Sequence, residues 1–451
     1  MKMTKRLLVA ALVLAVVTGL VLTGCQKKES AAAGDKITLR VLNYFDMTSA
    51  NSADEIAQVW DAFEKANPDI TVIREDLFNE PFHNKVEAYA AAGQLPDVVY
   101  AWPSGRSTTL HTQKLLKDLG PLIAKDGIAS FYTPSALDPS AQGAGYLGIL
   151  PRAITSSHAF YINNEVLRDA GLSPAKTYDE LKAQAPILRA KGYDTIAMGN
   201  QDTWVMQSCF FSLIAGRFCG EGWEQKILSG QAKFTDSDFV GALNFVKTLY
   251  DDGVLTKATL TTDYGSVLGQ FATNKAAYLI DGDWRVGAFI TDQSTGQAVI
   301  SPERQRDIQI TVFPDIAGVK FNKSTSVILG TGWGINANIP AGSPQEDAAW
   351  RLVKWLSGKE IQTWLLSSGA IATPTRTDID VGSLSLEPMQ KAISNIGQEY
   401  TTGTVVIDGA FHSDVHTPIN DGLQEIGMGT RTPEQVAQTV QQAFDAWKAA
   451  Q

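Results

Sequence analysis

Along the first hundred residues, short runs rich in β-branched residues alternate with stretches of helical periodicity. Residues 37–42, 70–73 and 98–100 have the composition of strands. Between the first two runs, apolar residues recur at helical spacing from residue 55 until Asn67-Pro68 stops the pattern. Strands and helices alternating at this length predict an α/β fold with parallel layers and right-handed crossovers. Ligands bind beyond the carboxyl ends of strands in such sheets, so the residues just after each run are the first candidates for a site.

Residues 433–448 carry a clear helical stripe near the other end of the chain. Thr432 is a suitable N-cap, and Pro433 suits the first helical turn. The apolar positions share one face, at Val436, Val440, Phe444 and Trp447. This stripe predicts core packing and not a ligand site.

The N-terminus has the pattern of an export signal. Three basic residues precede an apolar run over residues 7–22, which falls short of the roughly 20 residues that span a membrane. The run ends in Leu-Thr-Gly-Cys at residues 22–25, which resembles the lipobox of bacterial lipoproteins. We therefore expect a signal peptide over residues 1–24, and lipidation of Cys25 that anchors the chain to the extracytoplasmic face of the cell membrane without a transmembrane helix. The alternative is an ordinary buried cysteine behind an uncleaved anchor.

The part of the chain after the leader begins with a polar stretch and is acidic. Residues 25–35 are mostly small or polar and predict a flexible tether, since a first helix would need an apolar stripe. Without the leader, 35 basic and 48 acidic residues leave a net charge of about −13. That charge disfavours nucleic acid, whose phosphates require a basic surface, and broad adhesion to anionic lipid. A hydrophobic content of 44 % is typical of a folded globular protein, and a length of 427 residues favours two lobes over one core.

Besides Cys25, the chain has two cysteines, Cys209 and Cys219. An exported protein permits a disulfide between them, and the sequence leaves open whether they pair. Their spacing fits no strong metal-binding pattern. We therefore expect no metal site and no cofactor.

Seven short motifs are distributed over nearly the whole chain after the leader. They lie at residues 63–72 (FEKANPDITV), 92–99 (AGQLPDVV), 150–151 with 160–167 (LP, FYINNEVL), 177–181 (TYDEL), 271–284 (FATNKAAYLIDGDW), 330–335 (GTGWGI) and 369–374 (GAIATP). Together they resemble the family 1 extracellular solute-binding proteins of ABC importers, the maltose-binding type in its carbohydrate subclass. The chain departs from that pattern at Ile162-Asn163-Asn164, where Tyr-Asn-Lys is commoner, and at Asn274, which replaces the usual Gly.

The resemblance implies a two-lobed periplasmic-binding-protein-like fold of type II. Each lobe is an α/β unit that is discontinuous in sequence, and a multi-strand hinge joins the two. Crossings between the lobes are expected near residues 152–156, 311–314 and 357–375. The N-terminal lobe would comprise residues 36–153 plus 314–358, and the C-terminal lobe residues 154–313 plus 359–451.

The resemblance also implies a function. A monomeric lipoprotein would capture a sugar or oligosaccharide by hinge closure and deliver it to the transmembrane permease subunits of an ABC importer. A polyamine or glycerol phosphate is the alternative ligand, although a phosphate would favour basic residues at helix N-termini. The remaining alternative is a surface-anchored carbohydrate-active enzyme. The sequence contains no P-loop, no H-E-x-x-H and no G-x-S-x-G motif, so we expect no catalytic activity.

Aromatic residues near strand ends are the leading candidates for sugar binding, because a sugar ring has an apolar face edged by hydroxyls and ligand pockets pair apolar walls with a few polar groups. Trp284 follows the turn at Asp281-Gly282-Asp283, and the resemblance implies that it stacks on sugar; sealing the strand end is the alternative. Asp281 and Asp283 would accept sugar hydroxyls or cap the next segment. Trp102 and Ser104 follow the strand at residues 98–100, where the first lobe would meet ligand.

Other candidates lie on both expected lobes. Asn43 and Tyr44 end the first strand and would face the cleft. Trp204 follows a polar loop at a place where the family often has an aromatic residue. Asp263 and Tyr264 are weaker candidates on the same lobe.

Late in the chain, Gly332 and Trp333 would present a backbone amide or an indole ring to ligand, with buried packing as the alternative. Asp414 and His416 lie in a stretch that the family uses to face the cleft. Their alternative roles are solvated side chains or a helix N-cap.

For several charged residues, a structural role is the alternative to ligand binding or the expected role. Glu75, Asp76 and Glu80 follow the second predicted strand and either recognise hydroxyls or form a solvated acidic loop. Arg376 either grips a ligand or forms a surface ion pair. Asp97 is expected to fix a turn.

Overall fold

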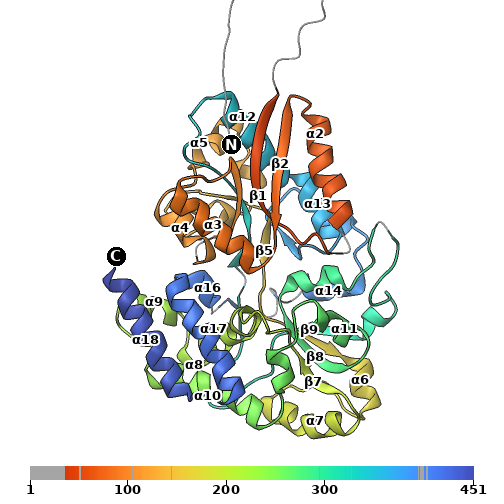
Figure 1. Ribbon diagram of the computed structural model, residues 1–451. Helices are drawn as coiled ribbons and strands as arrows, with labels where there is room; N and C mark the ends of the chain where they lie inside the picture. The colour runs from red at the N-terminus through yellow and green to blue at the C-terminus, as the bar shows by residue number, and fades with distance from the viewer. Residues whose placement is uncertain are drawn as a thin grey trace, which may run out of the picture.

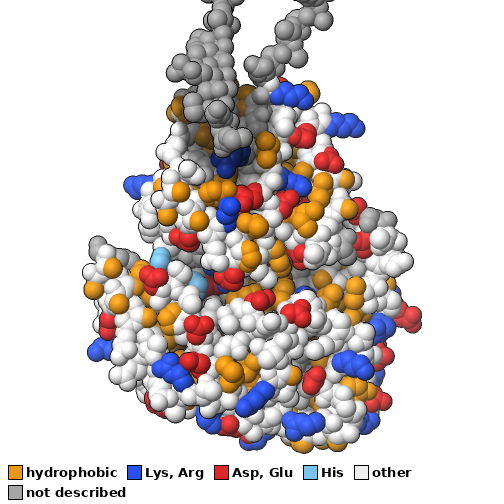
Figure 2. Space-filling model, in the orientation of Figure 1, with side chains coloured by type: hydrophobic (Ala, Val, Ile, Leu, Met, Phe, Trp, Pro, Cys, Tyr) orange, Lys and Arg blue, Asp and Glu red, His pale blue; other side chains and the backbone are white. Residues whose placement is uncertain are grey.

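The computed structural model describes residues 36–450 except 50–51, 104, 144, 294, 327, 395, 397–400 and 403–404. The predicted signal peptide over residues 1–24, Cys25, the tether to residue 35 and Ser104 lie outside the described residues. The chain forms two α/β lobes, the upper and lower halves of Figure 1, and the predicted two-lobed fold is confirmed. On the face shown in Figure 2, acidic and basic side chains are interspersed over both lobes, and the molecule narrows between them. Within the described residues, no helix is long and apolar enough to cross a membrane.

The first lobe is built on a five-stranded sheet. Its strands, in spatial order, are β2 (Ile70–Leu77), β1 (Ile37–Tyr44), β3 (Val98–Ala101), β12 (Gly332–Ile335) and β4 (Leu150–Pro151). β1 is parallel to its neighbours β2 and β3, as the alternating pattern predicts, whereas β12 is antiparallel to β3 and β4. The helices of this lobe are α1 (Ser52–Glu55), α2 (Ala62–Ala66), α3 (Glu80–Ala92), α4 (Thr108–Thr112), α5 (Gly120–Asp126), α12 (Pro344–Leu356) and α13 (Lys359–Ser367).

The second lobe has a four-stranded sheet in the order β7 (Asp194–Ala197), β8 (Ala276–Asp281), β6 (Ala159–Asn163) and β9 (Ile308–Thr311). Helices surround it and extend to one side, where the C-terminal helices lie together in Figure 1. They are α6 (Asn164–Asp169), α7 (Tyr178–Ala190), α8 (Ser212–Cys219), α9 (Trp223–Leu228), α10 (Ser237–Asp251), α11 (Ser266–Ala272), α14 (Pro388–Ser394), α16 (Ile407–Ala410), α17 (Ser413–Met428) and α18 (Pro433–Ala449), with a π-helical turn η5 (Met206–Phe211) before α8. β10 (Ser324–Thr325) and β14 (Thr401–Thr402) form a separate parallel pair.

The predicted C-terminal helix is confirmed as α18. The Thr432 side chain accepts a hydrogen bond from the backbone N–H of Gln435, and the Gln435 side-chain oxygen accepts one from the backbone N–H of Thr432, which completes a capping box. Val436, Val440 and Phe444 are buried in the core of the second lobe, and Trp447 packs against it.

One of the two departures from the family motif, Asn274, has a local explanation, and Asn163 keeps the Asn of Tyr-Asn-Lys. Asn163 is the N-cap of α6, where its side chain accepts hydrogen bonds from the backbone N–H groups of Glu165 and Val166. Asn274 has a φ of 59°, a left-handed conformation that glycine and asparagine tolerate best. Its side chain also accepts hydrogen bonds from Asn163 and Arg304, so Asn274 keeps the turn and adds a polar link.

A three-stranded antiparallel ladder joins the lobes. β5 (Ala153–Thr155) lies in the middle and pairs with β11 (Ile328–Leu329) on one side and β13 (Thr373–Pro374) on the other. β5 falls within the predicted crossing at residues 152–156. β13 lies within the predicted range 357–375, but the chain stays in the first lobe beyond it, to Ile379, and reaches the core of the second lobe at Met389.

The second crossing, predicted near residues 311–314, lies instead at β11. β9 pairs with β6 in the second lobe, and Phe313 and Ile316 belong to that lobe's core. Arg217, fully buried, explains why the chain stays there: its guanidinium donates hydrogen bonds to the carbonyl oxygens of Phe313 and Pro314 at 2.7 and 2.6 Å.

The predicted lobe boundary at residue 358 also differs from the packing. The buried residues of α13, among them Ile361 and Leu365, belong to the core of the first lobe together with Ile371 and Ile379. The amphipathic face of α13 is covered by the first lobe, so residues 359–379 extend that lobe. The core of the second lobe resumes at Met389.

Replacing Arg217 by Met should destabilise the protein by about 3 kcal/mol, because two buried carbonyl groups lose their donors. The free energy of unfolding from chemical denaturation measures this loss. The matched control is Arg189→Met, which removes an exposed guanidinium that donates to the carbonyl oxygen of Gly253 at 2.8 Å and should cost less than about 1 kcal/mol. Equal losses in the two variants would contradict the assignment.

Candidate functional site

A cavity of about 330 Å³ lies between the lobes, beside the hinge ladder. The first lobe contributes Tyr44, Phe78, Asn79, His83, Tyr100, Trp102, Pro103 and Arg106 to its wall. The second lobe contributes Trp204, Ser208, Tyr264, Asp283, Trp284 and Asp408. Hinge residues close the rest, chiefly 152–155, 328–331 and 370–372. The carboxyl ends of β1 and β3 thus face the cavity, as the α/β pattern predicts.

The wall on the first lobe is a cluster of aromatic rings at the ends of β1 and β3. The ring of Tyr44 stacks on that of Tyr100 at 5.7 Å and meets the indole of Trp102 edge-on at 5.0 Å. The imidazole of His83 lies 4.8 Å from Trp102. Burial lowers the pKa of His83 to about 3, so this ring is neutral near pH 7 and the wall is aromatic and uncharged there.

The side chains of Asn43 and Tyr44, which are neighbours in β1, lie on opposite faces of the sheet. Successive side chains of a strand point to opposite faces, and the face that carries Tyr44 is the one at the cavity. The predicted ligand contact at Asn43 is wrong: its side chain is 2 % exposed, does not line the cavity and donates a hydrogen bond to Asp76 at 2.8 Å.

Asn79 is a cavity residue that the sequence analysis missed. β2 continues to Leu77, four residues beyond the predicted run, so the residues that emerge at its carboxyl end are Phe78 and Asn79. Asn79 has a φ of 55° and a ψ of −145°, a conformation that is strained for any residue except glycine. Its side chain accepts a hydrogen bond from the Tyr44 hydroxyl at 3.1 Å and so orients that ring.

The acidic residues expected at this edge have structural partners. Glu75 and Asp76 lie within β2, where Glu75 binds Tyr89 and Lys85, and Asp76 binds Asn43. Neither lines the cavity. Glu80 begins α3 and pairs with Arg106 at 3.0 Å.

The wall on the second lobe carries two of the predicted indole rings. Trp204 and Trp284 lie 6.3 Å apart and both line the cavity. Tyr264 joins them: its hydroxyl accepts a hydrogen bond from Trp284 Nε1 at 2.7 Å, and its ring lies 5.0 Å from Trp204. Trp284 folds back over Gly282, where a Cβ would lie 2.2 Å from the indole, so only glycine fits there.

Asp281 and Asp283 differ in position: Asp281 lies behind the wall of the cavity, and Asp283 lines the cavity. Asp281 is fully buried behind the wall, where it pairs with Arg285 Nε at 2.5 Å and accepts a hydrogen bond from Tyr264, so the predicted ligand contact at Asp281 is wrong. Asp283 lines the cavity and accepts a hydrogen bond from the Ser156 backbone N–H at 2.7 Å. Burial raises the pKa of Asp283 to about 7.

Gly332 and Trp333 lie in β12 and not at the cavity. A Cβ on Gly332 would lie 2.4 Å from the carbonyl oxygen of Leu150, so glycine is required for the approach of β4. Trp333 is 2 % exposed and packs edge-on against Tyr100 and Trp60. The predicted ligand contacts at both residues are wrong, and the packing alternative holds for Trp333.

Asp414 and His416 lie in the first turn of α17 and also miss the cavity. Asp414 is exposed beside the N-cap His412. His416 is buried, and burial lowers its pKa to about 4. The predicted contacts are wrong here because the chain reaches the cavity one element earlier, through Asp408 of α16.

Two further expectations concern residues outside the cavity. Arg376 pairs with Asp378 at 2.8 Å and stacks on Phe131 and Tyr132, so its role is the ion-pair alternative. Asp97 accepts a hydrogen bond from the Arg40 backbone N–H at 2.7 Å, in line with a structural role.

Cys209 and Cys219 are both free. They lie ten residues apart along the continuous η5–α8 helix, a rise of about 15 Å that excludes a disulfide. Among the residues that the structure describes, no three His, Cys, Asp or Glu side chains are grouped to hold a metal ion.

Comparison with known proteins places this architecture in a family. The model of the family described as bacterial extracellular solute-binding protein matches residues 49–363. The maltotriose-binding protein of Pyrococcus abyssi is 23 % identical over 292 residues, 64 % of this chain and 56 % of that protein. The chain thus spans a little over half the length of this curated relative.

Two solved structures share the fold over nearly their whole length. A chitin oligosaccharide binding protein superimposes with a TM-score of 0.81 at 22 % identity, covering 92 % of this chain and 100 % of the other. The maltose/maltodextrin-binding domain MalE from Bdellovibrio bacteriovorus, bound to maltotriose, gives 0.71 at 19 % identity with the same coverage. The family match extends over more than half of the sequence, and the chain therefore belongs to the bacterial extracellular solute-binding proteins.

Proposed function

We propose that this chain captures a sugar or oligosaccharide between its lobes and delivers it to the permease subunits of an ABC importer. The observation that carries the proposal is that indole rings from opposite lobes, Trp102 above and Trp204 and Trp284 below, line one cavity. Aromatic faces on two sides suit the apolar faces of a sugar ring, and the polar groups beside the hinge suit its hydroxyls. Relatives named for maltotriose and for chitin oligosaccharide support the same class of ligand.

The charges around the cavity favour a neutral ligand. Arg106 is paired with both Asp408 and Glu80, and the cation of Arg152 lies over the ring of Tyr100 at 5.2 Å. A phosphate would meet no helix N-terminus rich in free cations here. A polyamine would need several ionised carboxylates, whereas Asp408 is already paired and burial disfavours ionisation of Asp283.

The lobes and the hinge suit a closure mechanism. A ligand that contacts both walls stabilises the closed arrangement relative to the open one, and the closed shape is what a permease would distinguish. We infer a monomer anchored to the outer face of the cell membrane through lipid on Cys25. Catalysis is not part of the proposal, because hydrolysis of a glycosidic bond needs two available carboxyl groups, and Asp408 and Asp283 are both engaged.

Ligand class can be tested by thermal unfolding of the protein with maltotriose, stachyose, chito-oligosaccharides, xylo-oligosaccharides, spermidine and glycerol 3-phosphate. A ligand at about 100 times its dissociation constant adds about 2.7 kcal/mol of stability and raises the melting temperature by several degrees. We expect a sugar to give this shift. A shift with spermidine or glycerol 3-phosphate alone would overturn the proposal.

Trp102→Ala and Trp284→Ala should each weaken binding of that sugar by roughly tenfold to 100-fold, because each removes one stacking face worth about 1–3 kcal/mol. Isothermal titration calorimetry gives the dissociation constants. Trp364→Ala is the control: Trp364 packs against the core of the first lobe, away from the cavity, so this variant should lose stability and keep its affinity. Unchanged affinity in both cavity variants would place the ligand elsewhere.

The burial of Asp283 predicts that the stability of the protein depends on pH. The pKa of Asp283 rises from 3.8 in the unfolded chain to about 7 in the folded one, so the folded state binds more protons between these values. Its contribution to stability is therefore favourable at low pH and falls as pH rises through this window, by at most about 1.4 kcal/mol per pH unit. In chemical denaturation, the stability of Asp283→Asn relative to wild type should increase from pH 4 to pH 7 and level off above. A difference that does not vary with pH would contradict the assignment.

A further inference from the structure

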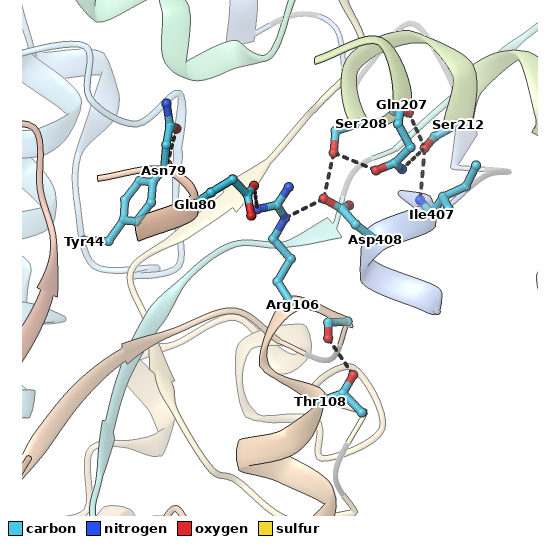
Figure 3. A network of polar contacts seen from close by, with 11 residues as sticks. Tyr44, Asn79, Glu80, Arg106, Thr108, Gln207, Ser208, Ser212, Ile407 and Asp408 are labelled. Carbon is cyan, nitrogen blue, oxygen red and sulfur yellow. Dashed lines mark hydrogen bonds and ion pairs between the residues drawn. The ribbon is translucent and has the colours of Figure 1, made fainter. Parts of the chain in front are cut away.

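A buried ion pair connects the two lobes beside the cavity (Figure 3). Arg106 belongs to the turn η2 (Gly105–Ser107) that follows β3 in the first lobe, and Asp408 belongs to α16 in the second. Nε of Arg106 donates to Oδ2 of Asp408 at 2.8 Å, and the two side chains are 12 % and 10 % exposed. At this exposure solvent and salt screen the pair much less than a surface pair.

Each partner is held in place from its own lobe. Glu80 at the start of α3 accepts a hydrogen bond from Arg106 Nη1 at 3.0 Å, and Ser208 of η5 donates one to Asp408 Oδ2 at 2.8 Å. Burial alone would raise the pKa of Asp408, but the positive charge and hydrogen bond of Arg106 hold it below the ordinary value. Both side chains are therefore charged and oriented by the protein itself, without a ligand.

The backbones of the two lobes also touch at this point. Gly105 has a φ of +31°, and a Cβ on it would lie 1.7 Å from the carbonyl oxygen of Asp408 and 2.4 Å from the Cα of Gly409. This contact leaves no room for a single methyl group. A second cavity of about 570 Å³, which Gly105, Glu224 and Trp447 help to line, shares Pro103 and Gly409 with the cavity of about 330 Å³.

We propose that Arg106 and Asp408, seated against Gly105, form an interlobe latch that stabilises the closed arrangement independently of any ligand. They are positioning residues: their contribution to affinity comes through the fraction of molecules that is already closed. The apparent dissociation constant is the intrinsic one divided by that fraction. Loss of the latch therefore weakens binding of every ligand of the cavity by the same factor. This statement about affinity rests on the proposed sugar-binding function, whereas the statement about the closed arrangement does not.

The decisive measurement is the distance between the lobes in the full chain without ligand. Spin labels at Lys65→Cys in α2 and Asp179→Cys in α7 report it, since both positions are exposed and lie on opposite lobes. Cys25 and Cys219 are replaced by Ser, while Cys209 is buried. We expect Arg106→Met and Asp408→Asn each to shift the distance distribution to longer values. Gly105→Ala should do the same by acting as a wedge, and it keeps both charges if a charge-removing variant folds poorly.

A matched control is available inside the first lobe. Lys117 pairs with Glu346 at the same 2.8 Å and at similar exposure, 16 % and 10 %. Lys117→Met should lower stability but leave the interlobe distance and the affinity as in wild type. An unchanged distance in Arg106→Met and Gly105→Ala would overturn the latch.

Affinity for maltotriose and a chito-oligosaccharide provides the second readout. Each single latch variant should raise the dissociation constant of a bound sugar by on the order of 30-fold. The factor should be the same for both sugars, and the double variant Arg106→Met with Asp408→Asn should lose less affinity than the two single variants combined. Factors that differ between sugars would show direct ligand contact and contradict the latch. If neither sugar binds wild type while the distance still shifts, the sugar proposal fails and the latch stands.

Discussion

The structure depends on the hydrogen-bonded ladder of β11, β5 and β13, because these strands join the lobes. The ladder is anchored on the first lobe by buried side chains. The Thr375 hydroxyl donates to the carbonyl oxygen of Pro151 at 2.9 Å, the Gln362 amide holds the Thr375 backbone N–H at 2.8 Å, and Ser357 donates to the carbonyl oxygen of Leu150 at 2.7 Å. These contacts hold the three strands together at one place between the lobes, and the cavity lies next to them.

Because the strands that join the lobes lie beside the cavity, the aromatic clusters around Trp102 and Trp284, one from each lobe, line the same cavity. Each cluster is packed by its own lobe: Tyr44 and Tyr100 support Trp102, and Tyr264 supports Trp284. Neither wall encloses a ligand alone. In the structure the two walls face one cavity, and the charges of Arg106 and Asp408 beside it neutralise one another. The result is a cavity whose surface is mainly apolar although the protein as a whole is strongly acidic.

The sequence predicts the beginnings of elements better than their ends, and this difference decides which site residues are found. The strands near residues 37, 70 and 98 begin where the hydrophobic runs begin, and Tyr44, Trp102 and Trp284 follow from strand ends or motifs. β2 extends four residues further than its apolar run, which hides Asn79. The pair of Arg106 and Asp408 has no local signal, because the two residues are 302 positions apart and meet only through the closure of the fold.

Errors in the prediction of the lobes have a similar origin. Nothing near residue 313 indicates that Arg217, almost a hundred residues earlier, holds that segment in the second lobe. Likewise the periodicity of α13 predicts an amphipathic helix but not which core covers it. Asn43 shows that a prediction can be wrong by a single residue. Neighbouring side chains of a strand point in opposite directions, and the packing of β1 beside β2 determines that Tyr44, and not Asn43, lies at the cavity.

The position of β12 has a consequence for the order in which the molecule acquires its shape. β12 separates β3 from β4 in the first sheet, yet it is made of residues 332–335, whereas its two neighbours lie within the first 151. A ribosome delivers the chain from its N-terminus, so β4 has no partner in that sheet until nearly three quarters of the chain has emerged. The amino-terminal half cannot settle into its final form early, and contacts this distant in sequence form slowly. Topology thus delays completion of the first sheet until residues 332–335 have been synthesised, later than the local propensities of its other strands would require.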